Sequence, residues 1–577
     1  MKENWRICNS SYKEIQGKYH LDPIHAKVIA NRTDTASASD YIDREGPLRD
    51  PMTMKGMSEA IALIRDTIAK GRAITVIGDY DVDGMTSSTI LYQALTKAGA
   101  SVRVRIPDRV EDGYGMRPYM VEDCVEHGDG LIITCDNGIR EFEAADTARR
   151  LGIPLIITDH HSIAEEDGME KLPDADVVVN PHQKTDPYGF ENLCGAGVAY
   201  QTARALMQSF GMPEDPDWIG YAALGTVCDV MELIGENRKI VYQGLRRWNA
   251  HPPASIQALM RQGSCEKLDV YAFGFIIGPM INSGGRLDSQ QNFISVMLSQ
   301  DPVQAETAAK KLFELNRQRQ LLTDKGMEQA AALCEKQKEQ TVQVIYLPEL
   351  HESLAGLVAG KIKEKYYRPT FVLTGTADAV KGSGRSIPAY NMFAEMNAVQ
   401  DCFSRFGGHP MAAGLSMDES RIGELRDRLN ANAHLTEEDL KPVVMIDMAM
   451  PLRYANAHTA DVIAELEPFG TGNADPMFAD KGLLLERVRW MGNRKKAANL
   501  FFSKDGEIYE TVTFRIEALH ECIAESASEE VWERLYLDGT LEKPIPMDIC
   551  YHVGWNVFRG RKHLQINVSH LRPSVVI

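Results

Sequence analysis

The stretch ITVIGDYDVDG, residues 74–84, decides how the first half of the chain is expected to fold. A short apolar run is followed by three aspartates, Asp79, Asp81 and Asp83, and then by a glycine. An apolar run of this length, bounded by a loop, is typical of a strand that is buried on both faces. Because ionised carboxylates repel one another, three of them at one strand end predict either a solvated turn or a site for cations.

Over residues 73–230, short apolar runs of this kind alternate with longer amphipathic segments. Residues 85–100 and 140–153 have the composition and spacing of helices. The apolar runs that we expect to be strands are AITVIG, SVRVRIP, GLIITCD, PLIITDHH and DVVVNP. Alternation of strand and helix predicts βαβ units and a mostly parallel sheet.

Acidic and imidazole side chains follow three of these strands. The carboxyl ends of parallel strands line one crevice, where ligands bind, so these side chains should converge. They are Asp79, Asp81, Asp83, Asp136, Asp159, His160 and His161, with Asp229 in ALGTVCDVMEL as a further candidate. Alone, a DxD or an HH pair is more often a solvated turn or a core residue. Together, at consecutive strand ends, they predict a metal site.

The donor types indicate which ions would bind. Oxygen ligands with one or two imidazoles suit Mn²⁺ or Mg²⁺, and the imidazole favours Mn²⁺. Two such ions a few ångströms apart can activate water and neutralise the transition state of a phosphoryl transfer. We therefore expect two ions as the cofactor.

Length and composition limit the class of protein. The 577 residues predict two to four domains, and 44% hydrophobic with 25% charged residues is the composition of a soluble globular protein. We find neither an apolar run of membrane-spanning length nor an apolar signal sequence at the start, and expect a cytoplasmic protein without membrane contact. Ten cysteines without CxxC spacing suit a reducing compartment. A net charge of −18 disfavours polyanion binding over the whole surface but permits a local basic groove.

The remaining chain divides by changes in pattern. A segment rich in Ala, Leu, Glu, Lys and Gln predicts a long connecting helix, a second strand–helix–strand pattern follows it, and alternating strands end the chain. The expected parts are an N-terminal segment (1–45), a catalytic domain (46–300), the connecting helix (301–340), a smaller α/β domain (341–440) and a β-barrel domain (441–577).

The motifs GDYDVDG, CDNG, TDHH and LGTVCDV resemble those of the DHH phosphoesterase superfamily. More narrowly, the chain is similar to the RecJ family of bacterial exonucleases, which degrade single strands from 5′ to 3′. This second likeness rests on LRDPMTMKGMSEAI, IPDRVEDGYG, NPHQKTDPYGFENLCGAGVAY, GPMINSGGRLDS, KGSGRSIP, FGGHPMAAGLSM and ELEPFGTGNADPMF. The resemblance implies an α/β protein in which a long helix joins a parallel-sheet DHH domain to a smaller DHHA1 domain, followed by an OB-like barrel.

The resemblance also implies roles for individual residues. Asp81 and Asp83 would each ligate one metal ion and Asp136 would bridge both, while His160 and Asp229 would complete the shells. His161 would face the scissile phosphate or the attacking water. Asp79 and Asp159 would orient the ligands, and a role as hydrogen-bonded turn residues is the alternative for both.

Substrate contacts are expected in glycine-rich loops, where backbone N–H groups can approach a phosphate. The candidates are Ser383, Arg385 and Ser386 in KGSGRSIP, and Gly408 and His409 in FGGHP. The resemblance adds Arg109 in IPDRVEDGYG, and Asn282 and Arg286 in INSGGRLD. Ordinary loops and surface ion pairs are the alternative interpretation. In RVRWMGNRKKAANLFFS and HVGWNVFRGRKHLQI, basic and aromatic residues alternate, which suits single-strand binding, although some of these aromatic residues would be barrel core.

The expected function is that of a metal-dependent exodeoxyribonuclease specific for single-stranded DNA. By the resemblance, it acts 5′→3′ by a two-metal mechanism, releases 5′ mononucleotides in DNA recombination and repair, and has a single-strand-binding protein and a helicase as candidate partners; a monomer is expected. One alternative is a DHH-type phosphodiesterase acting on short oligonucleotides or cyclic dinucleotides, which would not need the C-terminal domain. The other is a catalytically silent DNA-binding replication scaffold, which would not need a complete set of ligands.

Overall fold

The computed structural model describes residues 3–108, 112–287, 297, 301–376, 379–492, 494–558 and 560–574. The chain forms two compact units. One comprises Ile7–Phe313 and Ile446–Ile577, and the other comprises Met1–Arg6 and Glu314–Met445.

A parallel five-stranded sheet organises the first part of the larger unit, in the strand order β3-β2-β4-β5-β8. The strands are β2 (Ile74–Ile77), β3 (Val102–Arg105), β4 (Leu131–Cys135), β5 (Leu155–Thr158) and β8 (Val177–Val179). The three central strands, β2, β4 and β5, are buried along their whole length, as their continuous apolar sequence predicts. The predicted parallel sheet is confirmed.

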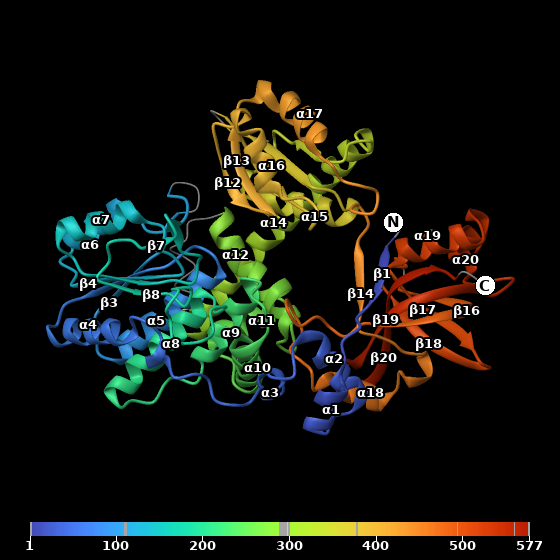
Figure 1. Cartoon of the computed structure of the whole chain (residues 1–577), viewed down its shortest axis with the longest axis horizontal. Helices are drawn as coiled ribbons and strands as arrows, with labels where there is room; N and C mark the ends of the chain where they lie inside the picture. Colours follow the sequence, from blue (N-terminus) through green and yellow to red (C-terminus); the bar gives the residue numbers. More distant parts are fainter. Residues whose placement is uncertain are drawn as a thin grey trace. The chain divides into compact units, whose positions relative to one another are not determined.

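Helices cover both faces of this sheet (Figure 1). Apolar residues of α6 and α7 pack on one face, and those of α4, α5 and α8 pack on the other. Their bounds are α4 (Met57–Ala69), α5 (Val82–Lys97), α6 (Pro118–Glu126), α7 (Phe142–Leu151) and α8 (Gly195–Phe210). Five further segments follow, namely α9 (Trp218–Cys228), α10 (Gly235–Ala250), α11 (Ala254–Gln262), a π-helix (Ala272–Ile277) and α12 (Gly278–Leu287). A short hairpin of β6 (Ala164–Glu166) and β7 (Met169–Lys171) precedes β8.

A closed barrel forms the C-terminal part of the larger unit, in the cyclic order β16-β17-β18-β20-β19. Its strands are β16 (Phe478–Met491), β17 (Ala497–Lys504), β18 (Glu507–Thr513), β19 (Ile545–Phe558) and β20 (Arg561–Pro573), with β15 (Met448–Ala449) alongside β16. Strands β18 and β20 run parallel, whereas the other barrel pairs are antiparallel. The predicted OB-like barrel is therefore confirmed.

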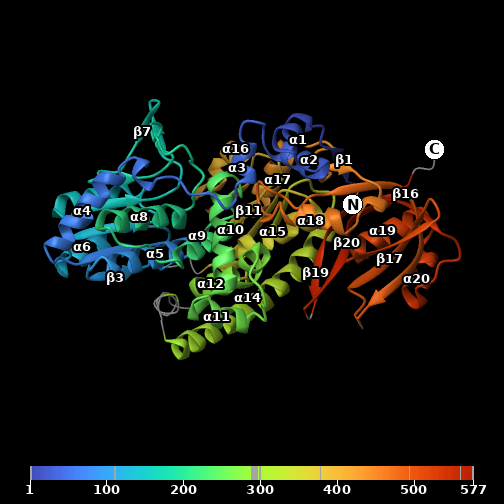
Figure 2. The ribbon, with the colours of Figure 1, turned by 90° about the horizontal axis from the view of Figure 1, so that it is seen from below.

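The alternating-strand pattern missed a helical insertion in this barrel. Between β18 and β19 lie α19 (Ile516–Ser526) and α20 (Glu529–Asp538), which Figure 2 shows beside the strands. Leu519, Ile523 and Leu535 are buried against the barrel core. The outer faces of both helices are rich in exposed glutamates.

The N-terminal segment ties the two parts of the larger unit together. It contains α1 (Lys13–Tyr19), α2 (Pro23–Arg32) and α3 (Ala38–Ile42). Arg32 makes two hydrogen bonds to Asp447, of 2.6 and 3.0 Å, at the start of the barrel domain. The fully buried Arg238 of α10 donates to the carbonyls of Tyr41 and Pro468. These buried polar contacts fix where the chain enters the barrel, near α18 (Ala457–Ala464).

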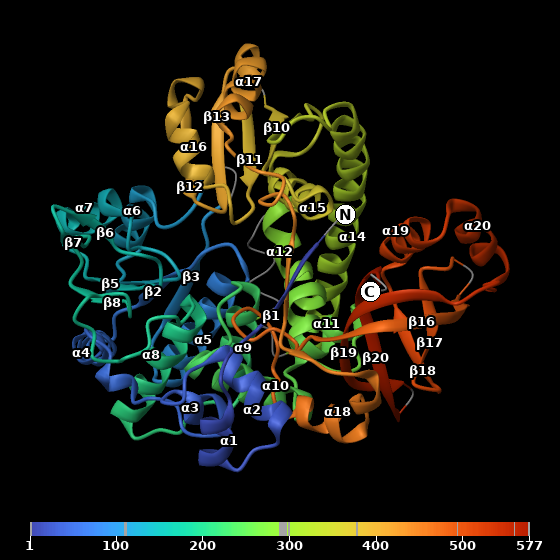
Figure 3. The ribbon, with the colours of Figure 1, turned by 45° about the vertical axis from the view of Figure 1, so that its right-hand side comes forward.

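The smaller unit is a five-stranded sheet in the order β12-β13-β11-β10-β9. Its strands are β9 (Gln343–Tyr346), β10 (Thr370–Gly375), β11 (Val380–Arg385), β12 (Arg405–His409) and β13 (Ala412–Met417). Strands β9 and β10 are parallel, and the other pairs are antiparallel. The helices are α14 (Pro302–Lys336), α15 (Ala355–Tyr366), α16 (Met392–Ala398) and α17 (Ile422–Asn432) (Figure 3).

Residues of α14 and α15 pack on one face of this sheet, and residues of α16 and α17 pack on the other. The 35-residue α14 runs from the larger unit into the smaller one, which confirms the predicted long connecting helix. Strand β1 (Asn4–Ile7) pairs with β14 (Val443–Ile446) where the chain returns to the larger unit. Among the described residues, no helix combines the length and the apolarity that a membrane crossing requires.

Candidate metal centre

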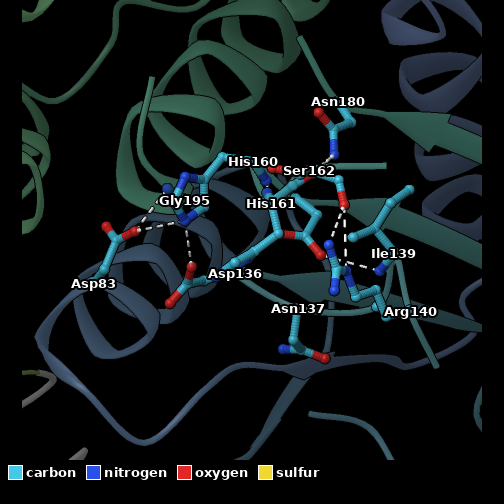
Figure 4. Close-up of polar contacts among 12 residues, drawn as sticks. Asp83, Asp136, Asn137, Ile139, Arg140, His160, His161, Ser162, Asn180 and Gly195 are labelled. Carbon is cyan, nitrogen blue, oxygen red and sulfur yellow. Dashed lines mark hydrogen bonds and ion pairs between the residues drawn. The ribbon is translucent and has the colours of Figure 1, made fainter. Parts of the chain in front are cut away.

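The ends of β2, β4 and β5 bring the predicted acidic and histidine side chains together. Asp81 caps α5 just after β2, and its carboxylate accepts a hydrogen bond from the amide of Gly84 at 3.0 Å. Asp136 directly follows β4, and His160 lies two residues after β5. Asp229 ends α9. Figure 4 shows Asp83, Asp136 and His160 pointing toward one another, so segments that are distant in sequence share one site.

The side chains form three overlapping groups of possible ligands. The ligand atoms of the first group, Asp83, His160 and Asp229, all lie within 4.8 Å of one another, and so do those of the second, Asp79, Asp81 and Asp136, and those of the third, Asp136, Asp159, His160 and His161. Asp136 also adjoins the first group, because its Oδ1 is 3.1 Å from Nε2 of His160. The same nitrogen is 3.7 Å from Oδ2 of Asp83 and 3.7 Å from Oδ2 of Asp229. This arrangement offers two neighbouring positions for cations, with Asp136 between them.

Backbone amides hold Asp83 in place. Its two carboxylate oxygens accept hydrogen bonds from the amides of Gly195 at 2.6 Å and Ala196 at 2.8 Å. Both amides belong to the first turn of α8, where free N–H groups and the helix dipole favour a negative charge. Gly225 of α9 passes so close that a Cβ there would lie 2.5 Å from Oδ1 of Asp83. The site therefore depends on the close packing of α5, α8 and α9.

Burial and mutual repulsion make the carboxylates hard to ionise without cations. Burial, and then the neighbouring Asp83, raise the pKa values of Asp81 and Asp136. Burial, followed by Asp83 and Asp81, raises the pKa of Asp229 to about 8. Burial lowers the pKa of His160, which keeps its ring neutral near pH 7, the form that binds metal ions. Bound cations would reverse this repulsion, so the donor set fits two divalent ions.

His161 has a different environment from His160. Oδ1 of Asp159 lies 2.8 Å from Nδ1 of His161 and also accepts hydrogen bonds from the amides of His160 and His161. Burial lowers the pKa of His161, but the hydrogen bond and the charge of Asp159 outweigh it and raise that pKa to about 9. The backbone carbonyl of His161 accepts a hydrogen bond from Asn180 (Figure 4). His161 is thus a cation whose side chain is 39% exposed, at the edge of the carboxylate cluster.

Three neighbours of this centre were not singled out from the sequence. Gly195 holds Asp83, Asn180 holds the backbone of His161, and Tyr114 contacts both His161 and Asp136. Tyr114 belongs to IPDRVEDGYG, the motif that also contains Arg109. Residues that act by holding a neighbouring side chain follow no periodic pattern in the sequence. The only sequence signal for Tyr114 and Gly195 is that both lie within motifs that resemble those of the RecJ family.

The predicted substrate contacts of the smaller unit lie on two strands. Ser383 and Arg385 belong to β11, and Arg385 donates hydrogen bonds to Oγ of Ser383 at 3.0 Å and to the carbonyl of Gly384 at 2.7 Å. Gly408 and His409 belong to β12 and are exposed. Ser386 is buried and donates its hydroxyl to a backbone carbonyl at 2.6 Å, so it supports the loop from within.

The remaining predicted contacts concern the larger unit. Asn282 is half-buried in α12. Arg286 lies in the same helix, but its side chain is outside the described part of the structure. Arg109 also lies outside the described residues.

The aromatic residues of the barrel divide between core and surface. Phe502 is fully buried, and Phe501 is also buried but has the guanidinium of Arg487 over its ring at 4.0 Å. Trp555 similarly carries Lys562 at 4.0 Å. These pairs put positive charge beside aromatic rings on the barrel, the combination that single-strand binding uses.

Comparison with known proteins agrees with this architecture. Three family models match in order along the chain: "DHH family, N-terminal domain" at residues 73–226, "DHHA1 domain" at 339–434 and "RecJ OB domain" at 446–570. The single-stranded-DNA-specific exonuclease RecJ of Bacillus subtilis is 33% identical over 99% of this chain and 74% of its own length. The chain belongs to the RecJ family.

Two solved RecJ structures from Thermus thermophilus extend the comparison. The complex with Mn²⁺ superposes with a TM-score of 0.81 at 26% identity and covers 100% of this chain and 80% of that one. The complex with Mg²⁺ has a TM-score of 0.75 at 25% identity and covers 99% and 78%. The RecJ of Thermus thermophilus is thus known in complex with each of the two ions that the donor set of this chain suits.

Proposed function

We propose that this chain is a single-stranded-DNA-specific exonuclease that hydrolyses phosphodiester bonds in the 5′→3′ direction and releases 5′ mononucleotides. The observation that carries the proposal is the convergence of Asp81, Asp83, Asp136, His160 and Asp229 at one sheet edge, in a chain with all three RecJ-type domains. The same fold could serve a silent scaffold. The set of candidate ligands is complete, and burial and mutual repulsion raise the pKa values of Asp136 and Asp229, which favours an enzyme that binds cations there.

The five candidate ligands would hold two Mn²⁺ or Mg²⁺ ions, with Asp79 beside them. When bound, such ions supply positive charge to the phosphate and lower the pKa of a water molecule. The amides of Gly195 and Ala196 fix one carboxylate ahead of binding, so less ordering is needed when an ion arrives.

His161 would contact the phosphate rather than a metal ion. Its ring is protonated near neutral pH, because Asp159 accepts a hydrogen bond from Nδ1 and favours the charged form. A protonated imidazole can donate a hydrogen bond to an oxygen of the scissile phosphate and stabilise the charge that develops there. Asp159 would act by orienting that ring.

We assign the domains to steps of substrate handling. Residues 46–300 would carry the catalytic centre, 341–440 would bind substrate through Ser383, Arg385, Gly408 and His409, and 441–577 would bind the strand. Stacking and phosphate contacts carry little base information, so sequence preference should be slight. Asn282, Arg286 and Arg109 would contribute further contacts from the catalytic domain. The connecting helix (301–340) would link the catalytic domain to the substrate-binding domain. The N-terminal segment (1–45) would link the catalytic domain to the strand-binding domain.

The cellular setting is proposed from the same activity. An exonuclease for single strands needs unpaired DNA, so a helicase and a single-strand-binding protein are candidate partners. The scattered cysteines suit a cytoplasmic location. We propose that the chain acts as a monomer.

The test uses one single-stranded oligonucleotide, labelled at its 5′ end in one reaction and at its 3′ end in another, with Mn²⁺. Immediate release of labelled mononucleotide from the 5′ end, and a ladder from the 3′ label, are expected. Asp136→Asn should abolish both. Asp174→Asn, which alters an exposed aspartate of the same domain, is the matched control and should remain active. Turnover of dinucleotides alone, with long strands intact, would overturn the proposal in favour of a small-substrate phosphodiesterase.

A further inference from the structure

Tyr114 reaches the catalytic centre from the loop that follows β3. Its hydroxyl donates a hydrogen bond to the backbone carbonyl of Asp136 at 2.7 Å. The same oxygen lies 3.1 Å from Nδ1 and 3.3 Å from Nε2 of His161. The two rings meet edge to face, 5.5 Å apart at 73°. One hydroxyl therefore contacts both a candidate metal ligand and the imidazole expected at the phosphate.

The loop of Tyr114 is fastened to the segment that carries Asp136. The amide of Met116 donates to the side-chain oxygen of Asn137 at 3.2 Å. Gly115 has a φ of +78°, and a Cβ there would lie 2.5 Å from the carboxylate of Glu141, so only glycine lets the loop approach so closely. These contacts fix the backbone on the C-terminal side of Tyr114 and so restrict where its side chain can lie.

The hydroxyl helps to hold Asp136 in an uncommon conformation. Asp136 has a φ of +61°, a left-handed backbone conformation that is unfavourable for residues other than glycine. Its amide donates to the carbonyl of Thr158 at 3.2 Å, and its carbonyl accepts from Tyr114. Both backbone groups are thus bonded, and the carboxylate stays free to face the cation position.

The same hydroxyl constrains His161. Because its proton is given to Asp136, its oxygen is left as an acceptor toward the imidazole. Asp159 accepts from the same ring at Nδ1. Two oxygen atoms held at one imidazole restrict its rotation.

We propose that Tyr114 is a positioning residue of the reaction, whose single hydroxyl holds the Asp136 backbone and the His161 ring in a fixed relation. The inference rests on the proposed function and deepens it. If Tyr114 merely anchored its loop, the phenyl ring would suffice and the hydroxyl would be dispensable.

The test compares Tyr114→Phe with Tyr200→Phe. Tyr200 is a buried tyrosine of the same unit whose hydroxyl bonds to Glu214, away from the metal centre, so its variant controls for the loss of a phenolic hydrogen bond. For Tyr114→Phe, kcat on a single-stranded oligonucleotide should fall at least tenfold, while KM stays within twofold. Mn²⁺ binding without DNA, titrated by electron paramagnetic resonance, should weaken severalfold. The control should match the wild type in all three.

Two results would overturn the proposal. In one, kcat and Mn²⁺ affinity of Tyr114→Phe both stay within twofold of the wild type. In the other, KM rises with kcat unchanged, which would make Tyr114 a substrate contact. Tyr114→Leu provides a second measurement, because a role of the hydroxyl requires it to be at least as slow as Tyr114→Phe. An inactive wild type would refute the proposed exonuclease, whereas the Mn²⁺ titration would still decide whether the hydroxyl positions Asp136.

Discussion

Replacing Gly225 with alanine should damage the metal centre without altering any candidate ligand. Gly225 lies inside α9, and a Cβ at this position would be 2.5 Å from Oδ1 of Asp83, 2.6 Å from Cβ of Ala196 and 2.8 Å from Oγ1 of Thr86. The Cβ of Ala196 is fixed to its buried helix backbone, and the buried hydroxyl of Thr86 is hydrogen-bonded to a backbone carbonyl. The third atom belongs to the carboxylate of Asp83. The carboxylate is the group most able to move, so Asp83 should be displaced.

The magnitude follows from three contributions. Overpacking of a dense core costs about 1–3 kcal/mol. Displacing Asp83 weakens its charged hydrogen bonds to the amides of Gly195 and Ala196, each contributing about 1.5–3 kcal/mol. Alanine regains up to about 1 kcal/mol through its higher helix propensity. With one of the two hydrogen bonds lost, the free energy of unfolding should fall by about 3 kcal/mol.

Urea denaturation in EDTA, followed by circular dichroism, would measure the stability, and calorimetric titration would measure Mn²⁺ affinity. The affinity should fall at least tenfold, since Asp83 no longer faces His160. Gly17→Ala is the matched control, because Gly17 lies in helix α1 of the same unit, where an added Cβ would meet no described atom within 4 Å. It should be neutral or slightly stabilising. Stability within 1 kcal/mol of the wild type for Gly225→Ala, with unchanged Mn²⁺ affinity, would refute the reasoning.

Three further outcomes are expected. In EDTA, the free energy of unfolding should fall as pH rises from about 4 to 8, because Asp229, with a folded pKa of about 8, keeps a proton that the unfolded chain releases. Mn²⁺ should therefore raise Tm more at pH 8 than at pH 6. A larger rise at pH 6 would contradict this electrostatic argument. Arg32→Ala should destabilise the larger unit by about 3–5 kcal/mol, as measured by urea denaturation, because it leaves the buried Asp447 charge without its guanidinium. Arg385→Lys should raise KM for single strands with little change in kcat, and an unchanged KM would argue against a substrate contact.

The sequence by itself determined the sheet, the candidate ligand set and the order of the domains. Strands such as β2, β4 and β5 are nearly continuous apolar runs, and both their length and the loop residues that bound them can be read from the local sequence. Once the strands are parallel, the residues that follow them must share one edge, so the sequence alone predicts that Asp81, Asp136 and His160 lie close together. The sequence also predicts the connecting helix α14, because its interior is almost free of glycine and proline.

Only the tertiary structure decided how the side chains of the centre are held. The amides that fix Asp83 come from Gly195 and Ala196, and the hydroxyl that contacts Asp136 comes from Tyr114. These partners are distant in sequence and of ordinary residue types, so no spacing or periodicity marks them. The closure of the barrel by β18 and β20 is a long-range pairing of the same kind. Periodicity reports which face of an element is buried, whereas the partner that covers this face is set by the packing of the whole chain.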